Sequence, residues 1–288
     1  MEKNKAKQVV EILTEALPYI QKFSNKICVV KYGGAAMVEN KLKFSFARDI
    51  ALMKQVGINV IVVHGGGPQI DKQLDKVGIK RNFVDGIRVT DKETIEVVSN
   101  TLNDVINKEI VDLINGNGGN ALGIAKGNSS IKVKKYISKK VDYGYVGEIH
   151  NIDTNYICKL MNSGYIPVIA PLGYDEKNNI YNINADLAAS QIASKLSAEK
   201  LIFLTDQAGV LDQEKKLISS LNFNEIEELI SMKTITGGMI PKIKACLNAI
   251  ENNVKMAHIV DGRIQHSVLL EIFTNEGIGT LVKRCLNA

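Results

Sequence analysis

Apolar residues recur at intervals of three and four near the start of the chain, between residues 7 and 23. The residues in this stripe are Val9, Ile12, Leu13, Ala16, Leu17 and Ile20. Their spacing predicts an amphipathic helix, and Pro18 should break or kink it. Such a helix could cover its own domain or place its apolar face on another subunit, and the pattern does not choose between them.

Short apolar runs then alternate with helical patterns. "ICVVKY" (27–32) is followed by a helical pattern over 44–56, and "INVIVVH" (58–64) is followed by another over 68–77. Strands that alternate with helices in this way predict a mostly parallel sheet with helices on both faces. The expected fold class is therefore α/β, in the form of a three-layer αβα sandwich.

A longer helical pattern begins after "GIRVTD", where Thr90 and Glu93 have the spacing of a capping box. Its expected buried stripe is Ile95, Val98, Leu102, Val105 and Ile106. The helix should end at "NGNGGN" (115–120), which begins a G-x-G-x-x-A motif. That motif follows a helix and not a strand, so we discard it as a dinucleotide-binding fingerprint.

The segment "EKLIFLTDQAGVLD" (199–212) opens a further strand-rich region. A chain of 288 residues can form one large domain or two smaller ones. We expect two lobes, over residues 25–198 and 199–288, preceded by the N-terminal helix over 1–24.

Composition narrows the class of protein. Hydrophobic residues make up 45% and charged residues 23% of the chain, as in ordinary globular proteins. There is no apolar run of ~18 residues and no apolar segment in the charged N-terminus, so we expect no membrane association and a cytoplasmic location. The cysteines are far apart and lack a C-x-x-C motif, which predicts small core residues and neither zinc ligands nor disulfides. They are Cys28, Cys158, Cys246 and Cys285.

The net charge of +5 raises the question of an anionic partner. The densest basic run, "KVKKYISKK" (132–140), alternates like a solvated edge strand whose lysines discourage edge-to-edge pairing. No recognised nucleic-acid-binding motif or set of stacking aromatic residues accompanies it. We therefore expect no nucleic-acid partner.

Candidate chemistry begins at "VVKYGGAAM", where Lys31 ends an apolar strand and Gly33 and Gly34 follow. A lysine beside a turn with accessible amides can hold a phosphate group. An ordinary strand-end lysine before a glycine turn remains the alternative. A P-loop is excluded, because the chain contains no G-x-x-x-x-G-K-[ST] motif.

The segment "HGGGPQI" (64–70) repeats this arrangement at the end of the next predicted strand. Pro68 suits the first turn of a helix, and glycines permit close approach of a ligand to the backbone. Two such loops suggest two anionic ligands at the carboxyl ends of parallel strands. For His64, packing or hydrogen bonding is favoured over catalysis.

Arg88 and the segment "NINAD" supply further polar candidates. Arg88 precedes a helix and could hold a carboxylate with two parallel hydrogen bonds, or it could be a surface arginine. Asn182, Asn184 and Asp186 occupy alternate positions, which places them on one face of an extended segment. They form a candidate ligand-binding set, although Asp186 could also cap the helix that follows.

Lys242, in "TGGMIPKIK", falls in the first turn of a helix that Pro241 should start. A helix N-terminus disfavours a cation, so this lysine indicates a nearby anion. Gly237 and Gly238 would let that anion approach the backbone, although they could simply make a flexible turn.

Together, the motifs identify a resemblance to the amino acid kinase family. They occur in the order "KYGGAAM", "HGGGPQI", "GIRVTD", "NINAD", "TDQAGVLD" and "GGMIPK" and extend over nearly the whole chain. The match is to the members that use MgATP to phosphorylate the γ-carboxylate of N-acetyl-L-glutamate in arginine biosynthesis. The resemblance implies an acetylglutamate-binding and dimerisation lobe over 25–198 and an ATP-binding lobe over 199–288.

The resemblance also assigns roles to matching positions. Lys31 and Lys242 would stabilise the transferring phosphoryl group, and Asp186 would position them. The acetylglutamate site would comprise Gly66, Gly67, Arg88, Asn182 and Asn184, and the nucleotide site Gly33, Gly34, Thr205, Asp206, Gly209 and Val210. A carboxylate of pKa ~4.3 is already ionised at neutral pH, so the reaction needs no catalytic histidine. No protein side chain is expected to be a metal ligand.

A further resemblance concerns regulation. The N-terminal segment "VVEILTEALPYIQKF" (9–23) is similar to the helix through which arginine-inhibited members assemble as hexamers, as trimers of dimers. "HIVDGR" and "LLEIFTNEGIGT" resemble the arginine site of those members, which implies His258, Glu271 and Gly277 as ligands. A core histidine is the alternative for His258. The PII signal protein, which binds some relatives, remains a candidate partner.

Three rival functions share parts of this pattern. A kinase of a related carboxylate such as N-acetylaminoadipate would keep both lysines and the glycine loops. A Rossmann dehydrogenase would need G-x-G-x-x-G after the first strand, where this chain has "KYGGAA". A non-catalytic arginine sensor would be distinguished from a kinase by the absence of Lys31, Lys242 and Asp186. All three are present here.

Overall fold

A central eight-stranded sheet organises the protein. The computed structural model describes residues 3–125, 127–274 and 277–284. Neighbouring strands of the sheet run parallel, apart from the antiparallel pair β13–β14. In spatial order they are β12 (Ser220–Leu221), β14 (Thr280–Val282), β13 (Met256–Asp261), β11 (Lys200–Thr205), β1 (Ile27–Tyr32), β2 (Asn59–His64), β8 (Ile166–Ile169) and β5 (Ala121–Ile124).

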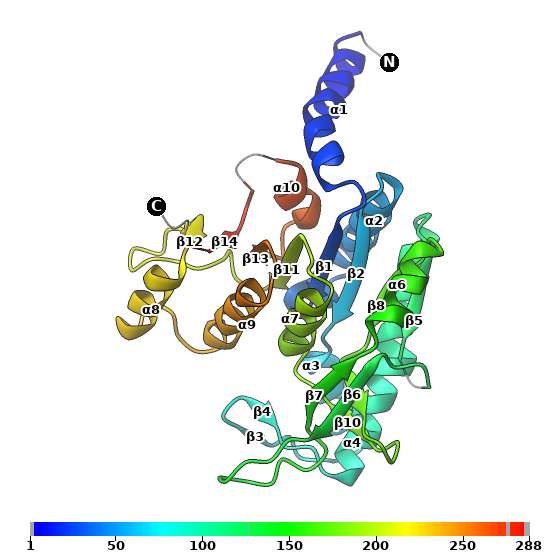
Figure 1. Ribbon diagram of the computed structural model, residues 1–288, viewed down its shortest axis with the longest axis vertical. Coiled ribbons are helices and arrows are strands. Elements are labelled where there is room, and N and C mark those ends of the chain that lie inside the picture. The colour runs from blue at the N-terminus through cyan, green and yellow to red at the C-terminus, as the bar shows by residue number, and fades with distance from the viewer. Residues whose placement is uncertain (1–2, 126, 275–276, 285–288) are drawn as a thin grey trace.

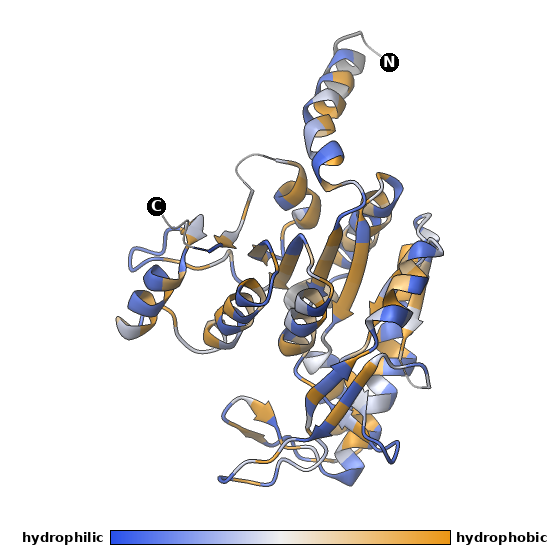
Figure 2. Ribbon diagram, in the orientation of Figure 1, coloured by the Kyte–Doolittle hydropathy of each residue, from blue (hydrophilic) through white to orange (hydrophobic). Residues whose placement is uncertain are grey.

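Helices cover both faces of this sheet, so the expected three-layer αβα sandwich is confirmed (Figure 1). Alternate residues of a strand point to opposite faces: Val29 belongs to one hydrophobic core and Val30 to the other. The first core is covered by α6 (Thr154–Asn162), α7 (Ala185–Lys195), α8 (Phe223–Ser231) and α9 (Met239–Glu251). The second is covered by α2 (Asn40–Gln55), α3 (Gly67–Lys76), α4 (Lys92–Asn100), α5 (Lys108–Gly116) and α10 (Ser267–Phe273). Figure 2 shows the hydrophobic colouring of the central strand β2.

The sheet is continuous across the expected boundary between the two lobes. Strand β1 pairs with β11 through four residues, from Cys28 opposite Lys200 to Lys31 opposite Phe203. The proposed division at 198–199 therefore falls between neighbouring strands of one sheet.

A second, four-stranded sheet lies beside the carboxyl ends of β1 and β2 (Figure 1). Its order is β10 (Ile180–Asn182), β9 (Leu172–Tyr174), β6 (Ile131–Lys135) and β7 (Gly147–Ile152). Strand β6 carries the basic run and is an interior strand, so its prediction as an edge strand is wrong. Its lysines are nevertheless solvated, because alternation places Lys132 and Lys134 on the exposed face.

The N-terminal helix α1 (Lys3–Phe23) projects from the body of the protein (Figure 1). It continues through Pro18, so of the two predicted effects, a break or a kink, the break is wrong. A proline has no backbone N–H, so the helix lacks only the hydrogen bond that residue 18 would donate to the carbonyl four residues earlier. Ile12 and Leu13 on this helix are 65% and 62% exposed, so nothing in the described protein covers them.

Two details of the long helical region also differ from the sequence prediction. Asp91, and not Thr90, caps α4 by accepting a 2.8 Å hydrogen bond from the amide of Thr94. The region is α-helical at both ends and π-helical between them, in η2 (Thr101–Asn107). The wider π turn changes the helical period, so Val105 falls outside the buried stripe and is 49% exposed.

The cysteine prediction is confirmed for Cys28 and Cys246, which are buried and free. Cys158 is free and half-buried on α6, and Cys285 lies outside the described residues. Burial raises the pKa of Cys28 to about 12, so its thiol stays protonated. Among the helices of the described residues, none has the length and hydropathy needed to cross a bilayer.

Candidate active site

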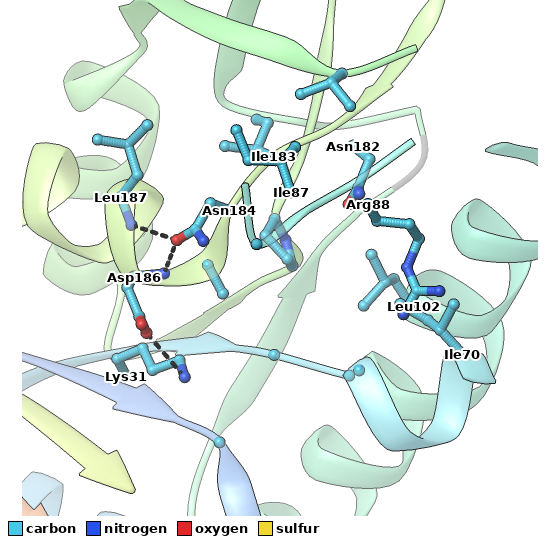
Figure 3. A pocket seen from close by; sticks show the side chains of 18 of the residues that line it. Lys31, Ile70, Ile87, Arg88, Leu102, Asn182, Ile183, Asn184, Asp186 and Leu187 are labelled. Carbon is cyan, nitrogen blue, oxygen red and sulfur yellow. Dashed lines mark hydrogen bonds and ion pairs between the residues drawn. The ribbon is translucent and has the colours of Figure 1, made fainter. Parts of the chain in front are cut away.

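A cavity of about 600 Å³ opens at the carboxyl ends of β1 and β2. Its wall is completed by the hairpin of β3 (Phe83–Val84) and β4 (Ile87–Arg88) and by the N-terminus of α7 (Figure 3). The fold therefore brings together segments that are far apart in the chain. The predicted residues that line this cavity are Lys31, Gly33, Gly34, Gly66, Gly67, Arg88, Asn182, Asn184 and Asp186.

Asp186 lies between two lysines at one side of the cavity. Lys31 Nζ is 2.9 Å from Asp186 Oδ1, and Lys242 Nζ donates a 2.9 Å hydrogen bond to Oδ2. The side chains of Lys31 and Asp186 are about nine-tenths buried. Burial acts to raise the pKa of Asp186, but the charges of Lys31 and Lys242 outweigh it and hold this pKa below its ordinary value. The carboxylate is therefore ionised and organises both ammonium groups.

The three charged residues come from three elements. Lys31 is on β1, Asp186 is in the first turn of α7, and Lys242 is in the first turn of α9. A carboxylate near a helix N-terminus is favoured by the helix dipole, whereas a lysine there is disfavoured. Within the protein, the anion beside Lys242 is Asp186; an anionic ligand that approaches the backbone at Gly237 and Gly238 stays a prediction.

Asn184 caps α7 and fixes the position of Asp186. Its Oδ1 accepts hydrogen bonds from the amides of Asp186 (2.9 Å) and Leu187 (3.0 Å) (Figure 3). The sequence alternative in which Asp186 is the cap is therefore wrong. The alternation also ends at Asn184, because Asp186 is already helical and reaches the lysines from the first turn.

The first glycine loop approaches both Lys31 and the second half of the chain. A Cβ on Gly33 would overlap Lys31 Nζ, so a side chain there would displace the ammonium group. Gly34 has φ of +67°, a conformation that favours glycine. A Cβ on Gly34 would lie 3.2 Å from the amide nitrogen of Asp206.

Arg88 faces the cavity from the other side (Figure 3). Its side chain is only 7% exposed, which excludes the alternative of a surface arginine. Nη2 donates a 2.6 Å hydrogen bond to Asp71, and the guanidinium group lies 4.5 Å from the centre of the Phe83 ring. Nη1 is buried without a hydrogen-bond partner in the described protein. A buried unpaired donor is costly, so this one is suited to a carboxylate ligand.

His64 is completely buried and lies outside the cavity lining. Its Nδ1 is 2.9 Å from the carbonyl oxygen of Gly65, and its Nε2 is 3.1 Å from Nδ2 of Asn107. Burial lowers the pKa of His64 to about 4, so the ring is neutral at neutral pH. It is packed and hydrogen-bonded, as the sequence analysis favoured.

A second cavity, of about 390 Å³, lies beside the loop that follows β11. Asp206, Gly209 and Val210 line it. Thr205 does not, because it is buried at the end of β11 and donates a 3.1 Å hydrogen bond to the Asp206 carboxylate. Sequence reasoning missed several lining residues, among them Thr236, Met239 and Arg263. Gly237 and Gly238 were the signal that could have pointed to Thr236 and Met239, because these two residues flank the glycine pair.

His258, Glu271 and Gly277 come together in a separate cluster. His258 Nδ1 donates a 2.5 Å hydrogen bond to Glu271 Oε1, while Glu271 Oε2 accepts from the amides of Ile278 (2.8 Å) and Gly279 (3.1 Å). A Cβ on Gly277 would lie 2.9 Å from both carboxylate oxygens. Burial lowers the pKa of His258, and its Nε2 is buried without a hydrogen-bond partner in the described protein.

A metal ion could be held by protein side chains only where several ligands converge. Within 3–125, 127–274 and 277–284 there is no group of three or more His, Cys, Asp and Glu side chains with that arrangement.

Comparison with known proteins shows which family this chain belongs to. Residues 26–261 match the model of the amino acid kinase family. The chain belongs to this family. Among curated members, it is 51% identical over 279 residues to acetylglutamate kinase of Campylobacter hominis, an alignment that covers 97% of this chain and 98% of the relative. It is 53% identical over 280 residues to acetylglutamate kinase of Campylobacter fetus subsp. fetus, with 97% and 99% covered.

Solved structures that are similar to this amino acid kinase include N-acetylglutamate synthase from Neisseria gonorrhoeae, determined with coenzyme A and N-acetyl-glutamate. The TM-score is 0.87 at 25% sequence identity, and the match covers 95% of this chain. This chain spans 63% of the length of that synthase chain.

Proposed function

We propose that the protein transfers the terminal phosphoryl group of ATP to the γ-carboxylate of N-acetyl-L-glutamate, giving N-acetyl-L-glutamyl 5-phosphate for arginine biosynthesis. The observation that carries this proposal is the Lys31–Asp186–Lys242 cluster, in which Lys31 and Asp186 line a cavity that also contains the buried Arg88. The extensive identity to acetylglutamate kinases supports the choice of substrate.

The chemistry requires two anions to meet. A carboxylate nucleophile is already ionised, so the protein must position it and offset the charge on the phosphoryl oxygens. Lysine carries three N–H donors. Lys31 and Lys242 can therefore each keep one contact with Asp186 and donate to the phosphoryl group, while Asp186 holds the ammonium groups in place.

Substrate orientation follows from the position of Arg88 across the cavity from Lys31. We assign the α-carboxylate of N-acetylglutamate to Nη1 of Arg88, because that buried donor lacks a protein partner. Gly66, Gly67, Asn182 and Asn184 complete this part of the site. The γ-carboxylate then points toward Lys31.

The nucleotide is assigned to the second cavity, with its phosphates directed toward Gly33 and Gly34. The close approach of Gly34 to the backbone of Asp206 supports this, because it brings the phosphate loop beside the cavity lining. Mg²⁺ is expected to accompany ATP and to be bound chiefly by its phosphate oxygens. On this assignment the lobe over 25–198 binds acetylglutamate and the lobe over 199–288 binds ATP.

The test is a substrate panel. The pure protein is incubated with MgATP and, separately, N-acetylglutamate, glutamate, N-acetylaminoadipate or carbamate, while ADP and hydroxylamine-trapped acyl phosphate are measured. We expect both products with N-acetylglutamate. Selective turnover of N-acetylaminoadipate would move the protein to a related kinase function, and no turnover by folded protein would favour a binding role.

Feedback inhibition by arginine is the regulatory part of the proposal. A guanidinium group could donate to the unpartnered Nε2 of the neutral His258 and lie near the ionised Glu271. Addition of arginine to the same assay should lower the rate, and Glu271→Gln should weaken this inhibition without loss of the uninhibited rate. A wild-type enzyme whose rate is unchanged by arginine would refute it.

We also propose assembly as a hexamer of three dimers through α1, in the cytoplasm. The exposed apolar side chains of this helix, including Ile12 and Leu13, support it, because burial of such residues favours association. Light scattering should give a mass about six times that of the chain, and the double substitution Ile12→Glu and Leu13→Glu should reduce it. The PII signal protein is a candidate partner, to be tested by co-purification.

A further inference from the structure

The hydrogen bonds around His64 have a direction that can be derived from one carbonyl group. Nδ2 of Asn107 lies 3.0 Å from the carbonyl oxygen of Val168. A carbonyl oxygen only accepts, so this atom of Asn107 must be the amide nitrogen, with two hydrogens to donate. The second hydrogen is directed to Nε2 of His64, at 3.1 Å. Nε2 therefore accepts and carries no proton.

A neutral imidazole has one protonated nitrogen, so in His64 the proton is on Nδ1. This nitrogen donates to the carbonyl oxygen of Gly65, at 2.9 Å. The ring thus holds the Gly65 carbonyl on the buried side of the glycine loop, and Asn107 fixes the tautomer that allows it to do so.

A peptide unit held by its carbonyl also has a fixed N–H direction. The described residues contain no cis peptide bond, and in a trans peptide the C=O and the N–H point in opposite directions. Gly65 and Gly66 line the large cavity, whereas His64 is buried behind them. With the Gly65 carbonyl turned toward His64, the Gly66 N–H is turned toward the cavity.

The remaining hydrogen bonds of the loop fix its ends and leave this central peptide to His64. The Gly65 amide donates to the carbonyl of Tyr32 at 2.8 Å, and the Gly66 carbonyl accepts from the Ile70 amide at 2.9 Å. Glycines on both sides of a peptide offer little resistance to its rotation. A rotated peptide would present the carbonyl oxygen of Gly65 to the cavity, where the proposed ligands are anions.

We propose that His64 is a positioning residue that, held by Asn107, keeps the Gly66 amide aimed at the negative charge that develops between the reacting carboxylate and the phosphoryl group. The position of Lys31 supports this orientation of the Gly66 amide. Lys31 Nζ lies 3.9 Å from the position that a Cβ of Gly65 would occupy, so the glycine loop and the Lys31 ammonium group are close together. The inference rests on the proposed kinase function. It gives His64 a role through the backbone and none in proton transfer.

Two variants separate this role from simple packing. In His64→Asn, the side-chain amide can replace Nδ1 as the donor to Gly65 but does not reach Asn107. In His64→Gln, the amide can replace Nε2 in the contact with Asn107 but loses the donor to Gly65. Both variants remove the ring, so both should lower the melting temperature to a comparable extent.

We expect His64→Gln to lose about 100-fold in kcat, as when an oxyanion donor is removed, with KM values changed less than about threefold. His64→Asn should recover at least about tenfold of that loss. Equal kcat values for the two variants, or a loss confined to KM, would overturn the inference. If wild-type protein did not phosphorylate N-acetylglutamate at all, the proposed function would fail instead.

A second measurement does not depend on turnover. Nitrogen-15 NMR of histidine-labelled protein reports which ring nitrogen carries the proton, and the signals missing from His64→Asn identify His64. We expect an Nδ1–H tautomer in the wild-type protein, and a change to a mixture of tautomers in Asn107→Ala. An Nε2–H tautomer in the wild-type protein would exclude the proposed role.

Discussion

Lys242 and Asp186 are joined by a 2.9 Å hydrogen bond that links the first turn of α9 to the first turn of α7. The two residues are 56 positions apart in the chain and on opposite sides of the boundary between the proposed lobes. This bond therefore joins the proposed nucleotide half to the proposed acetylglutamate half at the site of phosphoryl transfer.

Removal of the Lys242 ammonium group should slow the reaction. In Lys242→Ala the phosphoryl oxygens lose one of two cationic donors, so we expect kcat to fall by roughly 10² or more. Lys244→Ala is the matched control, because Lys244 is on the same helix but exposed to solvent. Steady-state assays of both variants measure the difference, and near-wild-type turnover of Lys242→Ala would contradict the assigned role.

Arg88 should determine the affinity for the amino acid substrate. In Arg88→Lys the planar fork is lost, so we expect the KM for N-acetylglutamate to rise roughly 10- to 100-fold, with the KM for ATP unchanged. Arg81→Lys is the control, because Arg81 contacts the same Asp71 at 3.7 Å but is 48% exposed. Equal effects of the two substitutions would remove the case for a direct contact between Arg88 and the substrate.

Gly34 should tolerate no side chain. In Gly34→Ala a Cβ would meet the Asp206 amide nitrogen at 3.2 Å in a backbone with positive φ, so we expect a higher KM for ATP and a loss of stability of about 1 kcal/mol or more. Gly78→Ala provides the comparison, because Gly78 has φ of +74° with no atom within 4 Å of its Cβ position. That variant should be strained to a similar extent but keep the wild-type KM for ATP.

Burial of neutral His64 should make stability depend on pH. Its folded-state pKa of about 4 lies below the ordinary value of 6.5, so between these values the unfolded chain takes up a proton that the folded protein does not. This contribution is complete above pH 6.5 and is lost as the pH falls toward 4, by on the order of 3 kcal/mol.

Urea unfolding of wild-type protein and His64→Asn at pH 7.0, 5.5 and 4.5 measures this loss. The free energy of unfolding of the wild type should fall more steeply with decreasing pH than that of the variant. His150→Asn, which changes an exposed residue of β7, should keep the wild-type slope. Parallel slopes for the wild type and His64→Asn would show that His64 does not titrate in this way.

The sequence predicted the layers of the fold because they depend on local patterns. Residues that alternate along β1, such as Val29 and Val30, must serve two different cores, and that requirement is visible as a continuous apolar run. Strand order is not visible in this way, since β6 is an interior strand although its lysines suggested an edge. Neighbours in a sheet are determined by the path of the whole chain.

The candidate site was predictable where a residue conflicts with its own local surroundings. Lys242 at a helix N-terminus indicated a nearby negative charge, and in the structure the carboxylate of Asp186 contacts it. The contact of Arg88 with Asp71 was not predictable, because it depends on how the β3–β4 hairpin packs over α3. The shift of Val105 to the surface was also hidden, because a π-helical turn has no simple sequence signature.

The π-helical segment η2 therefore places a constraint on chain length. Asn107 is the last residue of η2 and contacts His64, while Leu102 and Ile106 of the same segment pack against Gly66. Deletion of one residue before Asn107 would restore an ordinary helix and turn each later side chain by about 100° relative to those before it. The number of residues in this segment is therefore constrained, because a shorter segment would turn Asn107 away from the glycine loop.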